Sequence, residues 1–195
     1  METQRFRFSQ GQNTSPFDPL SQEIFIPREE QHNLRIAVVA GGSDTYGLVH
    51  EIAKILVTLS GQFEVYLFSN ANLDSTLDSR FHRIEVGQQL DELTKDVDLV
   101  LTTSSTSSLE FLARGLCVGI VCAVDNQEQY YDSLGELGVA AQIGFRNLEN
   151  GWELDKEGIQ SLITSSELRL NLRAKAKGLI DFKGASRIVS AITVL

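Results

Sequence analysis

The chain has 195 residues and a mass of 21.6 kDa, which is enough for one ordinary domain. Its composition, 42% hydrophobic and 22% charged, is that of a globular protein and excludes a disordered or fibrous one. There are 17 Lys and Arg against 26 Asp and Glu, so the net charge is −9. Because such a charge repels phosphate backbones, we expect no nucleic-acid partner.

Sequence features that would place the chain in a membrane or in an oxidising compartment are missing. No run approaches the roughly 18 consecutive apolar residues of a membrane-spanning helix, and the first residues lack a signal-peptide core. We therefore expect a cytoplasmic protein. Cys117 and Cys122 are five residues apart in a strand-like run, so their side chains should lie on opposite faces. The three histidines are far apart, and we expect no disulfide, metal or cofactor.

Two regions of different character follow one another along the chain. Residues 1–33 hold all three prolines and show no periodicity, so we interpret them as a tail or interdomain linker. Residues 34–195 should form one domain, because short apolar runs alternate there with segments of helical periodicity. The expected strands are Leu34–Ala40, Phe63–Phe68, Phe81–Val86, Asp98–Thr103, Val118–Val124 and Val139–Gly144. The expected helices are Leu48–Leu59, 89–96, Thr106–Arg114, Gln127–Leu137, Leu154–Thr164, Glu167–Lys177 and Ala185–Val194.

This alternation predicts an α/β fold with a parallel sheet that is covered on both faces. Right-handed crossovers then make it a doubly wound, Rossmann-like, mostly parallel sheet of six strands with helices on both faces. The basic residues between Glu167 and Arg187 are typical of a solvated helix face, although they could also meet a partner. Ligands bind at the carboxyl ends of the strands in such a sheet, so the segments after the strands are the candidate sites.

The segment after the first predicted strand has the sequence GGSD. Gly41 and Gly42 would allow the backbone to approach a ligand closely, while a simple turn with Ser43 or Asp44 capping the next helix explains the same residues. The pattern is not GxGxxG, and the second strand ends without the acidic residue that binds an adenosine ribose. A dinucleotide is therefore disfavoured.

Every residue from Thr102 to Ser108 is Ser or Thr, and a helix is predicted to begin within this segment. A helix N-terminus with small hydroxyl side chains can bind an anion without any lysine. Glu110 lies four residues past Thr106, where its carboxylate could accept hydrogen bonds from ribose hydroxyls. An equally simple interpretation is a capping box formed by Ser107 and Glu110. The third segment, Asp125–Gln127, offers amides to a sugar but is also ordinary turn chemistry.

Four stretches taken together resemble a known family: GGSD, SSTSSLEFLARGLCVGIV, DNQEQYYDSLGELGVA and IDFKGASRIVSAI. They are similar to the C-terminal, nucleotide-sugar-binding half of GT-B fold proteins. The nearest likeness is to the UDP-sugar hydrolases of pseudaminic acid biosynthesis, and a more distant one is to the N-acetylglucosaminyltransferases of peptidoglycan synthesis. The resemblance runs from about Pro27 to the C-terminus and preserves the order of the four stretches.

The resemblance implies a UDP-sugar site and a role for each matching residue. Glu110 would bind the ribose, and Asn126 and Gln127 would approach the sugar. The diphosphate would lie on Ser105, Thr106 and Ser107, and Gly42 and Ser43 would line the cleft. The resemblance also implies a partner, which is an N-terminal acceptor and catalytic domain in the same or a separate polypeptide. Apolar surface left exposed where that domain would dock could make the isolated chain self-associate. The reaction would be hydrolysis or glycosyl transfer in the synthesis of surface polysaccharide or sialic-acid-like sugars, with its catalytic residues unassigned in this chain.

Two alternatives remain beside this interpretation. The family usually has a glycine in the phosphate loop and a proline after the residue that matches Leu116, whereas this chain has only Ser and Thr in the loop and Cys117 at the proline position. These departures favour a degenerate Rossmann-like binding or interaction module without catalytic activity. An independent hydrolase with a nucleophile among Ser104–Ser108 is disfavoured, because the sequence contains no GxSxG elbow.

Overall fold

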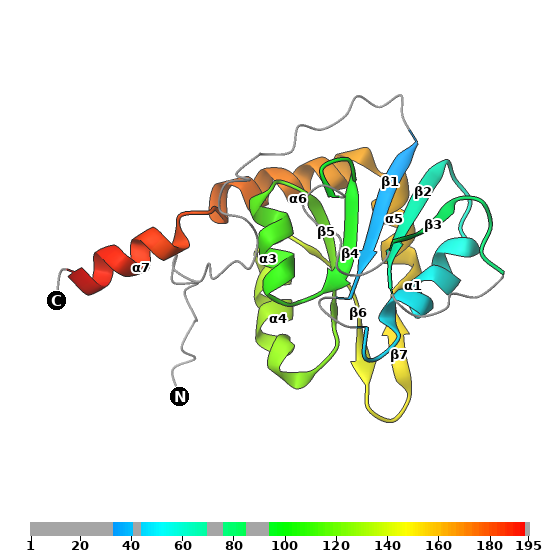
Figure 1. Ribbon diagram of the computed structural model, residues 1–195, viewed down its shortest axis with the longest axis horizontal. Coiled ribbons are helices and arrows are strands. Elements are labelled where there is room, and N and C mark those ends of the chain that lie inside the picture. Colours follow the sequence, from blue (N-terminus) through cyan, green and yellow to red (C-terminus); the bar gives the residue numbers. More distant parts are fainter. Residues whose placement is uncertain (1–32, 41–43, 70–75, 85–93, 194–195) are drawn as a thin grey trace.

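A computed structural model of the chain describes residues 33–40, 44–69, 76–84 and 94–193 (Figure 1). The predicted tail except its last residue, the loop residues Gly42 and Ser43, and most of the helix predicted over 89–96 lie outside these ranges. No helix within the described ranges is both long and apolar enough to cross a membrane.

The centre of the fold is a sheet whose strands lie in the order β3-β2-β1-β4-β5-β6-β7. Strands β1 to β6 are parallel, and β7 is antiparallel to β6. All residues of β4 and β5 are buried, because helices cover both faces, and this explains their continuous apolar sequences. The strands are β1 (Leu34–Val39), β2 (Phe63–Phe68), β3 (Phe81–Ile84), β4 (Leu99–Thr103), β5 (Cys117–Cys122), β6 (Ala141–Asn147) and β7 (Gly151–Leu154).

Two apolar cores, one on each face of the sheet, hold the helices in place. Along β4, Leu99 and Leu101 point into the core with α1 and α5, while Val100 points into the core with α3 and α4. The predicted α/β, doubly wound, Rossmann-like sheet with helices on both faces is thereby confirmed. The helices are α1 (Leu48–Val57), α3 (Thr106–Ala113), α4 (Glu128–Glu136), α5 (Lys156–Thr164), α6 (Ser166–Leu179) and α7 (Gly184–Thr193).

The sheet has seven described strands where the sequence predicted six, because β6 and β7 form a hairpin. Leu154, which we placed at the start of a helix, ends β7, and the helix begins only at Lys156. The side chain of Asn147 accepts hydrogen bonds from the N–H groups of Glu149 and Asn150, and Gly151 follows with a positive φ of 82°. The Asn-Gly pair at 150–151 is a turn signal that would have revealed this hairpin.

Helix α6 crosses the amino end of the sheet, where the parallel strands begin (Figure 1). It joins the two cores, since Leu172 belongs to one and Ala176 to the other. Its arginines bond to the ends of other helices: Arg169 donates to the carbonyls of Leu162 and Ile163 in α5, and Arg173 donates to the carbonyl of Gly115 after α3. The interpretation of this basic segment as a solvated face is therefore wrong for these two residues.

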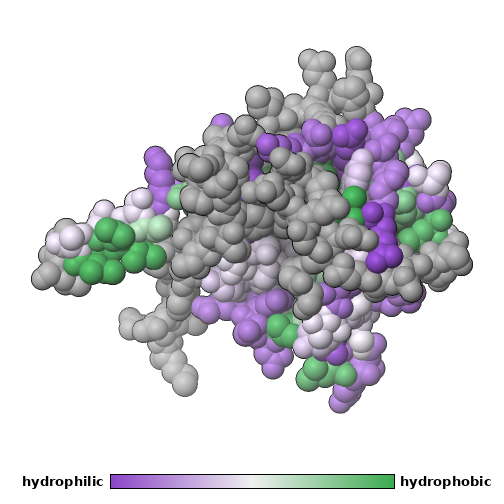
Figure 2. Space-filling view, viewed as in Figure 1, coloured by the Kyte–Doolittle hydropathy of each residue, from purple (hydrophilic) through white to green (hydrophobic). Residues whose placement is uncertain are grey.

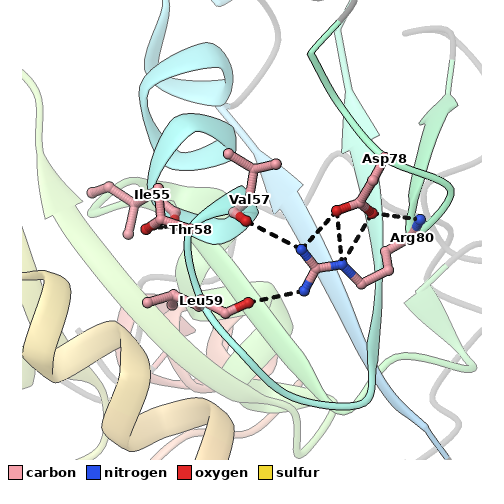
Figure 3. Close-up of polar contacts among 6 residues, drawn as sticks. All are labelled: Ile55, Val57, Thr58, Leu59, Asp78 and Arg80. Atoms are coloured by element: carbon pink, nitrogen blue, oxygen red, sulfur yellow. Dashed lines mark hydrogen bonds and ion pairs between the residues drawn. The ribbon is translucent and has the colours of Figure 1, made fainter.

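A third arginine at the amino end has the same role (Figure 3). The guanidinium of Arg80 donates to the carbonyls of Leu59 and Val57, at 3.0 and 3.3 Å, and to both carboxylate oxygens of Asp78. It also lies 4.5 Å from the ring centroid of Phe63. Arg80 thus connects the end of α1 to the beginnings of β2 and β3.

Helix α7 extends away from the rest of the domain (Figure 1). An ion pair between Asp181 and Arg187 holds its beginning against the preceding turn. Ile188, Val189 and Ile192 are exposed on it and form the apolar surface at its end in Figure 2. This helix contributes little to the core, since its buried residue is Gly184.

Candidate functional site

The candidate site lies at the carboxyl end of the sheet, where three loops meet. Strands β1, β4 and β5 are consecutive neighbours, so the segments that follow them emerge side by side. They are Asp44–Gly47 after β1, Ser104–Ser105 before α3, and Val124–Gln127 after β5. The strand order reverses between β1 and β4, and ligands bind at this type of position in doubly wound sheets.

Asp44 holds the loop after β1 in place. Its Oδ2 accepts a hydrogen bond from the N–H of Val49 at 3.2 Å, and its carbonyl accepts one from Gly47. Burial raises the pKa of Asp44, while the N–H groups of Val49 and Leu48 and the nearby His50 act in the opposite direction. The expected turn is thus present, and Asp44 accepts from the first turn of α1, although the N-cap position itself is occupied by Gly47.

The Ser/Thr segment is divided between inward and outward side chains. The Ser104 hydroxyl lies between the carbonyls of Val121 and Gln127, at 3.4 and 3.3 Å, and so connects the β4 loop to the β5 loop. The Ser108 hydroxyl donates to the carbonyl of Ser105 at 2.7 Å. Thr106 is exposed, and Ser105 and Ser107 are partly exposed. The residues that can reach a ligand are therefore Ser105, Thr106 and Ser107, three of the predicted set.

Helix α3 begins at Thr106 with Ser105 as its N-cap, and no side chain caps it. The predicted capping box of Ser107 and Glu110 is therefore wrong, because the helix starts earlier than that motif requires. The first turn contains no acidic residue, so nothing within it neutralises the positive end of the helix dipole. This end of α3 points to the carboxyl end of the sheet, beside the loop after β5.

Glu110 is placed differently from its neighbours. It lies on α3 one turn past Thr106, as predicted, but it is only 1% exposed. Its carboxylate is inside the protein, so a ribose contact would require the surrounding residues to open. The burial of Glu110 is a feature that its position in the sequence did not indicate.

The loop after β5 forms a short 3₁₀ helix, Asp125–Gln127. The Gln127 side chain is used within the loop, since its Oε1 accepts a hydrogen bond from the N–H of Ala123 at 3.0 Å. Asn126 is exposed. Asn126 is therefore open to a ligand, whereas Gln127 positions the loop. Among the described residues, no group of three or more His, Cys, Asp or Glu side chains could hold a metal.

Comparison with known proteins gives a likeness of fold alone. No protein-family model matches the chain, and no curated protein matches its sequence. Solved structures do match. Acinetobacter baumannii MurG has a TM-score of 0.65 at 16% identity, over 86% of this chain and 51% of that one. The Streptomyces sp. SF2575 glycosyltransferase SsfS6, complexed with thymidine diphosphate, has a TM-score of 0.55 at 15% identity, over 84% and 42% of the two chains.

A plant protein, Arabidopsis thaliana UGT89C1 complexed with UDP, matches with a TM-score of 0.56 at 16% identity, over 84% of this chain and 44% of that one. The chain thus spans about half the length of each of these proteins. The mostly parallel sheet, with seven strands in the described part of the chain, has the fold of one half of a GT-B glycosyltransferase.

Proposed function

We propose that this chain is the UDP-sugar-binding half of a nucleotide-sugar hydrolase or glycosyltransferase, acting in the synthesis of surface polysaccharide or sialic-acid-like sugars. One observation carries the proposal: the uncapped N-terminus of α3 lies between the β1 and β5 loops at the point where the strand order reverses. The same fold binds nucleoside diphosphates in two of the similar structures.

In this proposal each part of the site has a distinct task. The N–H groups at the start of α3 and the hydroxyls of Ser105, Thr106 and Ser107 hold the diphosphate, and Asn126 contacts the sugar. Gly42 and Ser43 complete the cleft, and Glu110 reaches the ribose once the ligand has opened its surroundings. Gln127 acts by positioning the β5 loop.

The proposed chemistry is the departure of UDP from the sugar. Negative charge develops on the diphosphate as the glycosidic bond breaks, and the positive end of α3 stabilises it there. A partner half, in the same or another polypeptide, delivers the acceptor hydroxyl or water together with the base that deprotonates it. Orientation of the two reactants across the cleft supplies much of the rate enhancement.

The proposal is tested by thermal unfolding of the chain with UDP, and with CMP and NAD as controls. Saturation at 100 times Kd stabilises a protein by about 2.7 kcal/mol, which raises Tm by about 5–10 °C for a domain of this size. Thr106→Glu adds a carboxylate at the exposed start of α3. This change should leave the unliganded Tm unchanged or raise it slightly, because a negative charge favours a helix N-terminus, but it should abolish most of the UDP shift.

Thr106→Gln is the matched neutral variant and should lose much less of the shift with UDP than Thr106→Glu, because it removes one hydroxyl contact without adding a charge. An equal response of Thr106→Glu and Thr106→Gln to UDP would contradict the location of the diphosphate.

The burial of Glu110 favours a second candidate, an interaction module that keeps the sheet and has lost the ligand. The Gln127 side chain accepts a hydrogen bond within its own loop, and this also favours the interaction module. If the chain is such a module, UDP at millimolar concentration should not change its Tm. A shift with UDP that CMP and NAD do not produce would exclude it.

A further inference from the structure

Three side chains form a cluster that the proposed site does not use. The guanidinium carbon of Arg146 lies 4.1 Å from the ring centroid of Tyr46. The indole Nε1–H of Trp152 donates to the carbonyl of Tyr46 at 2.9 Å. Arg146 and Trp152 are opposite one another in the β6–β7 register, so their side chains lie on the same face of the hairpin. We call these residues the hairpin cluster.

The hairpin cluster lies at the carboxyl end of the sheet. Tyr46 belongs to the loop after β1, and Arg146 is the penultimate residue of β6, which is parallel to β5. Both residues therefore lie at the end of the sheet where β4 is followed by the start of α3. The hydrogen bond from Trp152 ties the β6–β7 hairpin to the loop that begins the candidate site.

The guanidinium of Arg146 is not engaged by any polar group of the described residues. It makes no hydrogen bond or ion pair there, and it lies against the Tyr46 ring. Other arginines, in contrast, donate from their side chains to carboxylates or carbonyls, among them Arg80, Arg83, Arg169, Arg173 and Arg187. Arg146 is only partly exposed, and Tyr46 is 45% exposed.

A stacked guanidinium keeps its N–H groups available in its own plane while the ring face holds it in position. Less side-chain entropy is then lost when it binds a carboxylate or phosphate through two parallel hydrogen bonds. In a chain with a net charge of −9, such a cation at the ligand end of the sheet offers specific attraction to an anion.

We propose that Arg146, held by Tyr46 and Trp152, is a specificity-determining residue that binds an anionic group of the nucleotide sugar, either a phosphate or a carboxylate on the sugar. This inference rests on the proposed function. It assigns the β6–β7 hairpin to ligand recognition, together with the loops after β1, β4 and β5.

The test is isothermal titration of the full chain with UDP, UDP-glucose and UDP-glucuronate at low salt. Arg146→Gln should weaken binding by about tenfold, because a hydrogen-bonded pair with a charged group is lost. A loss for all three ligands identifies the phosphate, and a loss for UDP-glucuronate alone identifies a sugar carboxylate. The loss should shrink at 0.5 M NaCl, where exposed charges are screened. Arg146→Lys keeps the charge and should restore part of the affinity.

Arg35→Gln is the control, since Arg35 lies at the opposite end of the sheet and pairs with Glu64 and Asp96. The proposal is overturned if Arg146→Gln binds all three ligands as the wild type does, or if Arg35→Gln shows the same loss. If the wild-type chain binds none of the three ligands, the proposed function fails and this inference fails with it. If the wild type binds and Arg146→Gln binds equally well, the proposed function is retained and only the role of the hairpin cluster is contradicted.

Discussion

Arginines stack on aromatic rings at both ends of the sheet, but their surroundings differ. At the amino end, Arg80 lies over Phe63 and its guanidinium also bonds to two main-chain carbonyls and to Asp78 (Figure 3). At the carboxyl end, Arg146 lies over Tyr46 and its guanidinium makes no hydrogen bond within the described residues. Two arginines that each lie over an aromatic ring therefore differ in whether polar groups of the described residues also engage the guanidinium.

The direction of the helices explains this difference. In a doubly wound sheet each helix runs back against its strands, so helix C-termini and their unpaired carbonyls collect at the amino end. Arg80, Arg169 and Arg173 supply donors to the carbonyls at or just beyond the ends of α1, α5 and α3. Helix N-termini and their N–H groups collect at the carboxyl end, where anions are favoured. The amino end of the sheet therefore uses three arginines for stability, and at the carboxyl end Arg83 also bonds to a main-chain carbonyl, whereas Arg146 is the cation that we propose for binding.

The largest loss of stability is expected from a substitution that distorts the β6–β7 hairpin at the carboxyl end. Gly144 has φ of +139°, and a Cβ there would lie 2.3 Å from the carbonyl oxygen of Glu153. Because neither a Cβ nor a carbonyl oxygen can move without a shift of the hairpin backbone, Gly144→Ala should lower the free energy of unfolding by about 3 kcal/mol or more. Tm should then fall by about 6–12 °C. Differential scanning calorimetry measures this change.

Gly178→Ala is the control for that variant. Gly178 lies in α6 with no atom within 4 Å of an added Cβ, so alanine there should raise stability by up to about 1 kcal/mol through helix propensity. Equal stabilities of the two variants would show that the hairpin can bend to accept a side chain.

Substitution of either of the two stacked arginines should cost less stability, and Arg80 should cost more than Arg146. Arg80→Met keeps the packing over Phe63 and removes the donors to two carbonyls and to Asp78, so it should cost about 1–2 kcal/mol. Arg146→Met removes only the stacking on Tyr46 and should cost less than about 1 kcal/mol. Urea denaturation curves of the two variants provide the comparison. If Arg146→Met were the more destabilising, the carboxyl end would also use its arginine for stability.

The last prediction concerns the rates at which the two cysteine thiols, one at each end of β5, react with an alkylating reagent. Burial raises the pKa of Cys117, at the amino end, to about 12, and burial beside Glu128 also raises the pKa of Cys122 at the carboxyl end. Both thiols are free, but Cys117 is fully buried and Cys122 is 8% exposed. Iodoacetamide at pH 8 should modify Cys122 about tenfold faster or more, because Cys117 reacts only after unfolding. Peptide mass spectrometry resolves the two sites, and faster labelling of Cys117 would refute the prediction.

Much of this architecture could be predicted from local patterns. β4 and β5 are continuous apolar runs, and α1 shows helical spacing of Leu48, Val49, Ile52 and Leu56, so the sheet and its helices follow from periodicity. The convergence of the loops after β1, β4 and β5 followed from the parallel topology alone. The hairpin strand β7 was missed because its four residues establish no period and the Asn-Gly turn signal before them was not used.

The site was less predictable than the fold. The position of Glu110 on α3 was correct, but its burial depends on what packs over that helix. Gln127 was placed correctly after β5, yet its use in bonding Ala123 depends on the exact path of the loop. In both cases the residue's place in the chain was evident and the direction of its side chain was not.

The sequence by itself determined the strands β1 to β6, the helices that cover them and the end of the sheet at which the polar loops lie. It could do so because these features depend on the alternation of apolar residues along a few neighbouring positions. Only the tertiary structure decided that Arg146 meets Tyr46, 100 residues earlier, and that Arg80 reaches the end of α1. Such contacts arise from the packing of distant elements, and the spacing of residues along a chain carries no record of them.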